Sequence, residues 1–372
     1  MKIPLSQPDI TEAEIEAVTA VLRSPRLSLG PKLEEFEHAM AEYVGVPHAV
    51  AVNSGTSGLH LCIRALNTAE GDEVVVPSFT FIAAANAIRY ERATPVFVDI
   101  EPATLNLDPE KIEAAITPRT RAIMAVHTFG IPANMDAILE IAARHNLFVI
   151  EDACEAIGAE YKGRRAGSFG HAAVFAFYPN KQITTGEGGM IVTRDPALAN
   201  RMRALRNQGR YDADNWLQHE ELGYNYRISE INCALGIEQL KRIDEILRKR
   251  EGVAQAYQRE LEGIGELTLP PIHIPGVRIS WFVYVIRLAA GYSSEHRDQL
   301  QGFLIKNGIG CARYFAPIHR QPSYKEWKDL RLPVTESEAA RTLALPFFNN
   351  LSQLQIEEVG AAVRSGSRPI NI

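Results

Sequence analysis

Cysteine is scarce in this sequence, and its four residues lie far apart along the chain. Cys62, Cys154, Cys233 and Cys311 form no C-x-x-C pair and no cluster with the spacing of metal ligands. The sequence therefore predicts neither a disulfide framework nor a metal site. Isolated thiols are typical of a reducing cytoplasm, which is where we expect the protein to act.

Long apolar runs and an excess of positive charge are also absent. No apolar stretch approaches the roughly 20 residues that span a bilayer, and the N-terminal Met-Lys-Ile-Pro is not followed by the apolar region of a secretory signal. The formal net charge of −6 gives no general electrostatic reason to bind nucleic acid or an anionic membrane. We therefore expect neither a membrane protein nor a nucleic-acid-binding protein.

What the sequence does contain is the alternation of an α/β protein. A capping box at Thr11 and Glu14 predicts an amphipathic helix over 11–24. From residue 48, helical stretches alternate with apolar runs that are mostly continuous. The runs cover residues 48–52, 73–76, 95–98, 122–126, 147–150, 172–177 and 190–193. Continuous runs are typical of strands buried on both faces, so we expect a mostly parallel seven-stranded sheet covered by helices.

The pattern changes near residue 229, and 372 residues are enough for two domains. Long helical segments are predicted over 229–263. A strand over 281–288 and helices near 294–307 and 352–364 then predict a smaller α+β domain. We place the large domain at residues 1–250 and the small domain at residues 251–372. The cluster Arg248-Lys249-Arg250 is interpreted as a solvated helix face, because the chain as a whole is acidic.

Two polar segments follow predicted strands, where open α/β sheets bind ligands. Asn53–Gly58 begins a helix, so its backbone N–H groups can bind a phosphate, although an ordinary strand-to-helix turn looks similar. Glu151-Asp152 can present a carboxylate to a pocket. Taken alone, this pair is better interpreted as a helix N-cap.

Two further segments suit a cofactor. Lys181 precedes the Gly-rich stretch Gln182–Gly189, and a buried lysine can form a Schiff base, although a lone lysine is more often a surface charge. Gly223–Arg227 offers an amide and a guanidinium to a phosphate, or is simply a polar loop before a helix. Phe81 can contact a cofactor ring or pack in the core. A lysine, a carboxylate, an anion cup and a ring contact are together what pyridoxal 5'-phosphate (PLP) requires.

At these residues the sequence resembles the DegT/DnrJ/EryC1/StrS family of sugar aminotransferases, which have the type I PLP (aspartate aminotransferase-like) fold. The most specific match is the block from Lys181 to Gly189, which contains Thr-Thr-Gly-Glu-Gly-Gly. The resemblance runs nearly end to end. Supporting matches lie at 30–31, 54–57, 77–81, 95–99, 151–156, 223–227, 314–319 and 345–346.

The resemblance implies a set of cofactor contacts. Lys181 is expected to form the Schiff base and to move protons, and Asp152 to pair with the pyridinium nitrogen. Gly55 and Thr56 are expected to hold the phosphate, and Phe81 to stack on the ring.

The resemblance also implies contacts beyond one subunit's cofactor. Asn225 is expected to reach the phosphate of the neighbouring subunit, so that a homodimer shares its active sites. Arg227, Arg313 and His319 are candidate contacts for the sugar or the diphosphate.

Two positions depart from the commonest family pattern. Ala176 stands five residues before the lysine, where the family often has a serine that helps to bind the phosphate. Glu155, a further expected cofactor contact, stands where many members have glutamine or histidine. Glutamate there resembles the perosamine-synthase subset, which aminates C4 of a 4-keto-6-deoxy sugar nucleotide.

The implied reaction moves an amino group from L-glutamate to a keto-sugar nucleotide. Three alternatives remain. A PLP-dependent sugar dehydratase is disfavoured because those relatives replace the lysine with histidine. A non-catalytic regulator is disfavoured by the retained lysine, carboxylate and phosphate cup. An aminotransferase for a non-nucleotide keto substrate, such as a cyclitol or an aminobenzoate precursor, is the third.

Overall fold

The computed structural model describes residues 1–211 and 218–367. Within them, seven strands form the main sheet in the order β1-β9-β8-β5-β4-β2-β3. β9 is antiparallel to β1 and β8, and the other neighbours are parallel. The strands are β1 (His48–Val52), β2 (Glu73–Pro77), β3 (Thr94–Val98), β4 (Thr120–Val126), β5 (Phe148–Asp152), β8 (Ala172–Ala176) and β9 (Gly189–Thr193). The predicted, mostly parallel seven-stranded sheet is confirmed.

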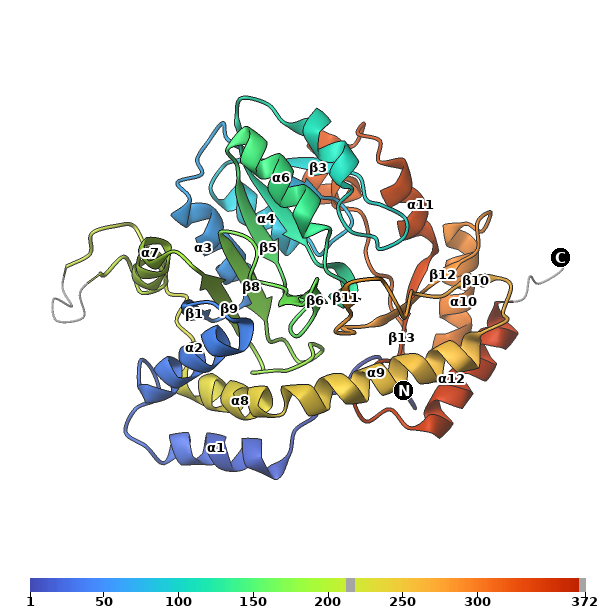
Figure 1. Cartoon of the computed structure of the whole chain (residues 1–372). Helices are drawn as coiled ribbons and strands as arrows, with labels where there is room; N and C mark the ends of the chain where they lie inside the picture. Colours follow the sequence, from blue (N-terminus) through green and yellow to red (C-terminus); the bar gives the residue numbers. More distant parts are fainter. Residues whose placement is uncertain (212–217, 368–372) are drawn as a thin grey trace.

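Helices cover both faces of this sheet (Figure 1). Because side chains alternate along a strand, Val74 and Val76 pack on one face and Val75 on the other. The first face carries α3 (Gly55–Ala65), α4 (Ala83–Tyr90) and α7 (Pro196–Arg206). The second carries α2 (Pro31–Val44), α6 (Met135–His145) and α8 (Glu230–Lys241). α1 (Glu12–Leu22) packs outside α8, and its predicted capping box is present.

The C-terminal unit has the predicted α+β architecture. An antiparallel sheet of β10 (Leu267–Thr268), β12 (Tyr284–Leu288) and β13 (Thr342–Leu345) packs with α10 (Ser294–Lys306), α11 (Pro333–Arg341) and α12 (Gln353–Gly366). The strand predicted over 281–288 begins only at Tyr284. The physical reason is that the Ser280 and Phe282 N–H groups bond to the carbonyls of Gly130 and Phe129 instead.

Short elements complete the described chain. A small sheet joins β11 (Val277–Arg278), β6 (Glu160–Tyr161) and β7 (Arg164–Arg165). The remaining helical turns are α5 (Pro109–Ile112), η1 (Glu113–Ala115), η2 (Thr128–Gly130), η3 (Ile318–Arg320) and η4 (Pro322–Trp327). All four cysteines carry free thiols. Across residues 1–211 and 218–367, none of the helices has the length and apolar character that crossing a bilayer requires.

The expected domain boundary falls inside a continuous helix. α9 (Ile243–Leu261) runs through the expected division at residue 250 and packs against α12 (Figure 1). The N-terminal residue Ile3 also joins the core of the C-terminal unit. The division at 250/251 therefore stays a proposal.

Candidate active site

The expected cofactor contacts come together around one cavity of about 460 Å³. Its lining includes Gly55, Thr56, Phe81, Asp152, Glu155 and Lys181, together with Ala176. Asp152 and Ala176 end their parallel strands at the same edge of the sheet, which is where an open α/β sheet binds ligands. Only Asn225 among the expected cofactor contacts lies outside the described lining.

The N-terminus of α3 forms the expected anion cup. Ser54 caps the helix: its hydroxyl accepts from the Ser57 N–H at 3.1 Å, and its carbonyl accepts from the Gly58 N–H at 3.1 Å. Within the described residues, the Gly55 and Thr56 N–H groups bond to no protein acceptor. Two free amides at a helix N-terminus suit an anion such as a phosphate ester.

Glycine is required at the first position of this helix. A Cβ on Gly55 would lie 2.7 Å from the Cβ of Ala176 and 3.1 Å from the Sγ of Cys154. The close approach brings the start of α3 onto the end of β8. β8 ends at Ala176, the position at which the family often has a serine.

The alternation of β5 separates the two carboxylates of Glu151-Asp152. Glu151 is fully buried on the far side, where its carboxylate accepts from the His127 ring at 2.9 Å and from the N–H groups of Gly167, Phe169 and Gly170 at 2.7–2.8 Å. Burial alone would raise the pKa of Glu151, but these hydrogen bonds hold it below its ordinary value.

Asp152 is the carboxylate that lines the cavity. It is the last residue of β5 rather than a helix N-cap, and its Oδ1 accepts from the Cys154 N–H at 3.2 Å. The strand extends two residues beyond the predicted end at residue 150, because Glu151 and Asp152 continue the parallel pairing with Ala125 and Val126.

Lys181 is not a surface charge, since its side chain is only 13% exposed. Its Nζ lies 3.6 Å from the Oε1 of Glu155 and 3.8 Å from the centre of the Phe282 ring. The other oxygen of Glu155 accepts from the Phe129 N–H at 2.9 Å. Burial raises the pKa of Glu155, although the neighbouring ammonium of Lys181 opposes the shift. The amine is thus held between a carboxylate and an aromatic face.

Three aromatic residues that line the cavity were not predicted from the sequence as site residues. Phe282, Tyr314 and Phe315 reach it from the C-terminal unit. Tyr314 and Phe315 fall in a segment that matches the family, but Phe282 carries no sequence signal of its own. Phe81 is 60% exposed at the cavity wall, which excludes the core-packing interpretation.

The remaining candidates are not part of the described lining of this cavity. Asn225 is exposed on a loop, where its carbonyl accepts from the Asn53 side chain at 3.4 Å. Arg227 donates to the Asn207 side chain at 3.0 Å.

Arg313 and His319 do not line the main cavity either. Arg313 is exposed and lines a separate cavity of about 330 Å³. His319 is buried: Nδ1 lies 2.7 Å from the Ser78 hydroxyl and Nε2 lies 3.2 Å from Glu336. Burial lowers the pKa of His319. Because the protein engages both ring nitrogens, the structure gives His319 no free atom for the main cavity.

A largely enclosed lysine, a strand-end carboxylate and a helix-N-terminal anion cup on this α/β fold define the class of PLP-dependent enzymes of fold type I. The residues fit PLP: the two unpaired amides suit its phosphate, and the enclosed amine suits a Schiff base. Residues 8–364 match the model of the DegT/DnrJ/EryC1/StrS aminotransferase family. The chain belongs to this family and is a PLP-dependent aminotransferase.

Individual relatives agree with this assignment. A GDP-perosamine synthase of Caulobacter vibrioides is 46% identical over 90% of each chain. The spore coat polysaccharide biosynthesis protein SpsC of Bacillus subtilis is 40% identical over 97% of this chain and 96% of its own. Among solved structures, DesV of S. venezuelae in complex with a ketimine intermediate is 38% identical, with a TM-score of 0.91 over the whole of both chains.

Proposed function

We propose that the protein moves an amino group from L-glutamate to C4 of a 4-keto-6-deoxy sugar nucleotide. The observation that carries the proposal is the enclosed Lys181 amine beside Glu155, in the cavity that ends at the Gly55–Thr56 cup. The perosamine synthases support the sugar position. Besides the Caulobacter protein, one of Escherichia coli O157:H7 is 38% identical over 95% of each chain.

Each of the cavity residues has a different proposed role. Lys181 would hold PLP as a Schiff base, with the phosphate on the Gly55 and Thr56 amides and Phe81 against the ring. Asp152 would keep the ring nitrogen protonated. PLP, when bound, supplies the electron sink and carries the amino group between the two substrates. Lys181, once its amine is free, would take and return the proton at the substrate carbon.

A homodimer with shared sites is part of the proposal. Asn225 is exposed and outside its own subunit's cavity, which suits a contact with the partner's phosphate. Large apolar side chains are exposed on α1 and the segment after it, which suits a subunit interface. They are Ile15 at 50%, Leu22 at 58%, Leu27 at 48% and Leu29 at 43% exposure.

A non-nucleotide keto substrate is the second candidate. The observation that favours it is the likeness to 3-amino-5-hydroxybenzoic acid synthase, which is 28% identical with a TM-score of 0.91 over 98% of both chains. A carbocyclic ketone is the substrate that separates this candidate from the first.

Spectroscopy of the two half-reactions tests the proposal. Glutamate should bleach the absorption band of the PLP-loaded protein. A GDP-linked 4-keto-6-deoxy sugar should restore the band faster than 3-keto-sugar nucleotides or a cyclitol ketone. Faster return with the cyclitol ketone would replace the proposed substrate class, and no bleaching by glutamate would remove the proposed donor.

A further inference from the structure

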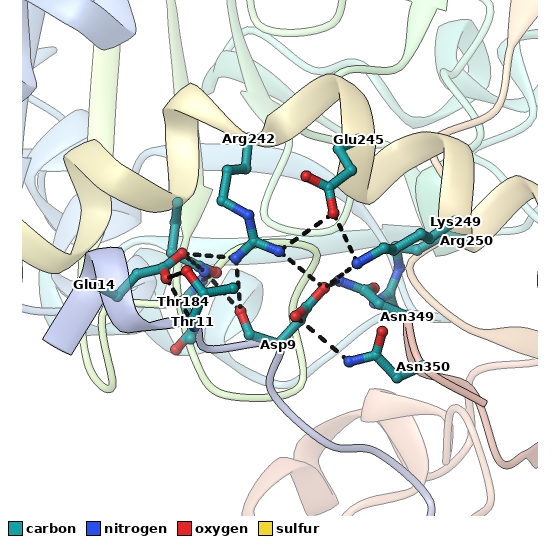
Figure 2. A network of polar contacts seen from close by, with 11 residues as sticks. Asp9, Thr11, Glu14, Thr184, Arg242, Glu245, Lys249, Arg250, Asn349 and Asn350 are labelled. Carbon is teal, nitrogen blue, oxygen red and sulfur yellow. Dashed lines mark hydrogen bonds and ion pairs between the residues drawn. The ribbon is translucent and has the colours of Figure 1, made fainter. Parts of the chain in front are cut away.

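A largely buried polar network joins three segments that lie far apart along the chain (Figure 2). Its centre is Asp9, which is 8% exposed. The Asp9 carboxylate accepts from the side chains of Asn349 at 3.1 Å and Lys249 at 3.2 Å, and it lies 3.4 Å from Arg242. Burial alone would raise the pKa of Asp9, but these partners hold it below its ordinary value. Asp9 is therefore a negatively charged residue of the N-terminal segment that binds both α9 and the C-terminal unit.

One arm of the network runs through Gln239 to the lysine turn. Gln239 is 1% exposed, and its Nε2 donates to the Asp9 carbonyl at 2.8 Å and to Glu14 at 2.7 Å. Its Oε1 accepts from the Thr184 N–H at 3.2 Å. Thr184 stands three residues after Lys181, and its hydroxyl donates to the Phe177 carbonyl at 2.9 Å. Gln239 thus fixes the turn that carries the amine.

The other arm runs through Arg250 to the ring beside the amine. The Arg250 guanidinium donates to the Asn349 side chain at 2.8 Å and to the Trp281 and Phe282 carbonyls at 2.7 Å each. The Phe282 ring in turn faces the Nζ of Lys181 at 3.8 Å. Arg250 is only 2% exposed, so interpreting it as part of a solvated helix face was wrong. The reason is that α9 turns this one residue of the basic cluster toward the C-terminal unit.

We propose that Gln239 and Arg250 are positioning residues for Lys181, one fixing its turn and the other fixing Phe282 against its amine, with Asp9 joining the two. The inference rests on the proposed role of Lys181. Neither residue belongs to the described lining of the cavity, so both act through another group. A buried guanidinium keeps its place firmly, because leaving its donors unpaired is costly. Displacing a reacting group by about 1 Å can slow a reaction roughly a hundredfold.

Three variants test the inference. Gln239→Met removes the bond to Thr184, and Arg250→Lys keeps the charge but loses the fork that spans Trp281 and Phe282. Glu245→Gln is the matched control, because Glu245 pairs with Arg242 and Lys249 at the exposed end of the network and touches neither arm. Thermal unfolding and circular dichroism establish that each variant folds. Arg250→Lys carries the test alone if Gln239→Met does not fold.

The measurement is the rate at which PLP added to apo-protein forms the Schiff-base absorption band, together with kcat and KM. Both arm variants should slow band formation and lower kcat roughly ten- to a hundredfold, with KM for both substrates unchanged. The control should match the wild type. Wild-type rates in both arm variants, or an equal loss in the control, would overturn the positioning role. A wild-type protein with no band, or a Lys181→Ala variant that keeps it, would instead remove the proposed function itself.

Discussion

Ala176 lines the anion cup where the family often has a serine. It ends β8 at the wall of the anion cup, in close contact with the start of α3 at Gly55. A methyl group there offers no hydrogen bond to a phosphate, so the contacts must come from the helix amides and, in the proposed dimer, from the partner subunit.

Ala176→Ser should tighten PLP binding. A hydroxyl at this position adds one donor toward the phosphate, and a hydrogen bond of ordinary strength lowers the Kd roughly threefold to tenfold. Titration of apo-protein with PLP, followed by fluorescence, measures the change. Ala176→Val serves as the comparison and should weaken binding, because the larger side chain crowds Gly55. An unchanged or higher Kd for the serine variant would show that the hydroxyl does not reach the phosphate.

Single residues also mark the limit of prediction from sequence. The residues at 152 and 181, taken together with the anion cup and the Gly-rich stretch, indicated the chemistry, because Schiff-base and carboxylate functions require those side chains. Their surroundings were not predictable. Whether a lysine is solvated, or an arginine such as Arg250 is buried, depends on which distant segments pack against it.

At the scale of elements, β5 carries its two carboxylates to opposite sides. Glu151 anchors the segment Gly167–Gly170 by three backbone N–H bonds, and it also binds His127. The loop that leads into β8 is thereby attached to the strand that presents Asp152.

Glu151→Gln should destabilise the protein by about 3 kcal/mol at neutral pH, because the amide replaces an acceptor oxygen with a donor that faces other donors. Denaturant unfolding measures the loss. Glu113→Gln, which removes exposed ion pairs, should change stability little. A loss confined to Glu113→Gln would contradict the anchoring role.

The stability difference between the wild type and Glu151→Gln should become smaller at acidic pH. The folded-state pKa of Glu151 lies below the ordinary 4.5, so its contribution is fully present above that pH. As pH falls through the lowered pKa, the carboxylate protonates and the wild type should approach the glutamine variant. A difference that grew with acidity would contradict this assignment.

The strands were predictable where burial leaves a plain pattern. Strands covered on both faces are continuously apolar, and β1 was predicted at its observed bounds for this reason, although it is an edge strand antiparallel to β9. The end of β5 was not, because its last two residues are acidic. The start of β12 was not, because the preceding residues bond to the turn at Thr128–Gly130, which no local pattern reveals.

At the scale of the whole molecule, the proposed dimer makes a prediction about mixed subunits. Lys181→Ala should be inactive, and Asn225→Ala should bind PLP weakly. A dimer of one subunit of each kind contains one site with both native residues, so subunit exchange in an equal mixture should restore roughly a quarter of wild-type activity. The activity of the mixture over time is the measurement. No gain above the two separate variants would place Asn225 outside the partner's site.

Lys181 is the residue on which the whole account depends, and one measurement addresses it directly. The PLP-loaded protein is reduced with borohydride, digested, and analysed by mass spectrometry to locate the bound pyridoxyl group. We predict that Lys181 is the single modified lysine. The Lys181→Ala variant should carry no pyridoxyl label. A label on a different lysine, or none in a protein that binds PLP, would contradict the account.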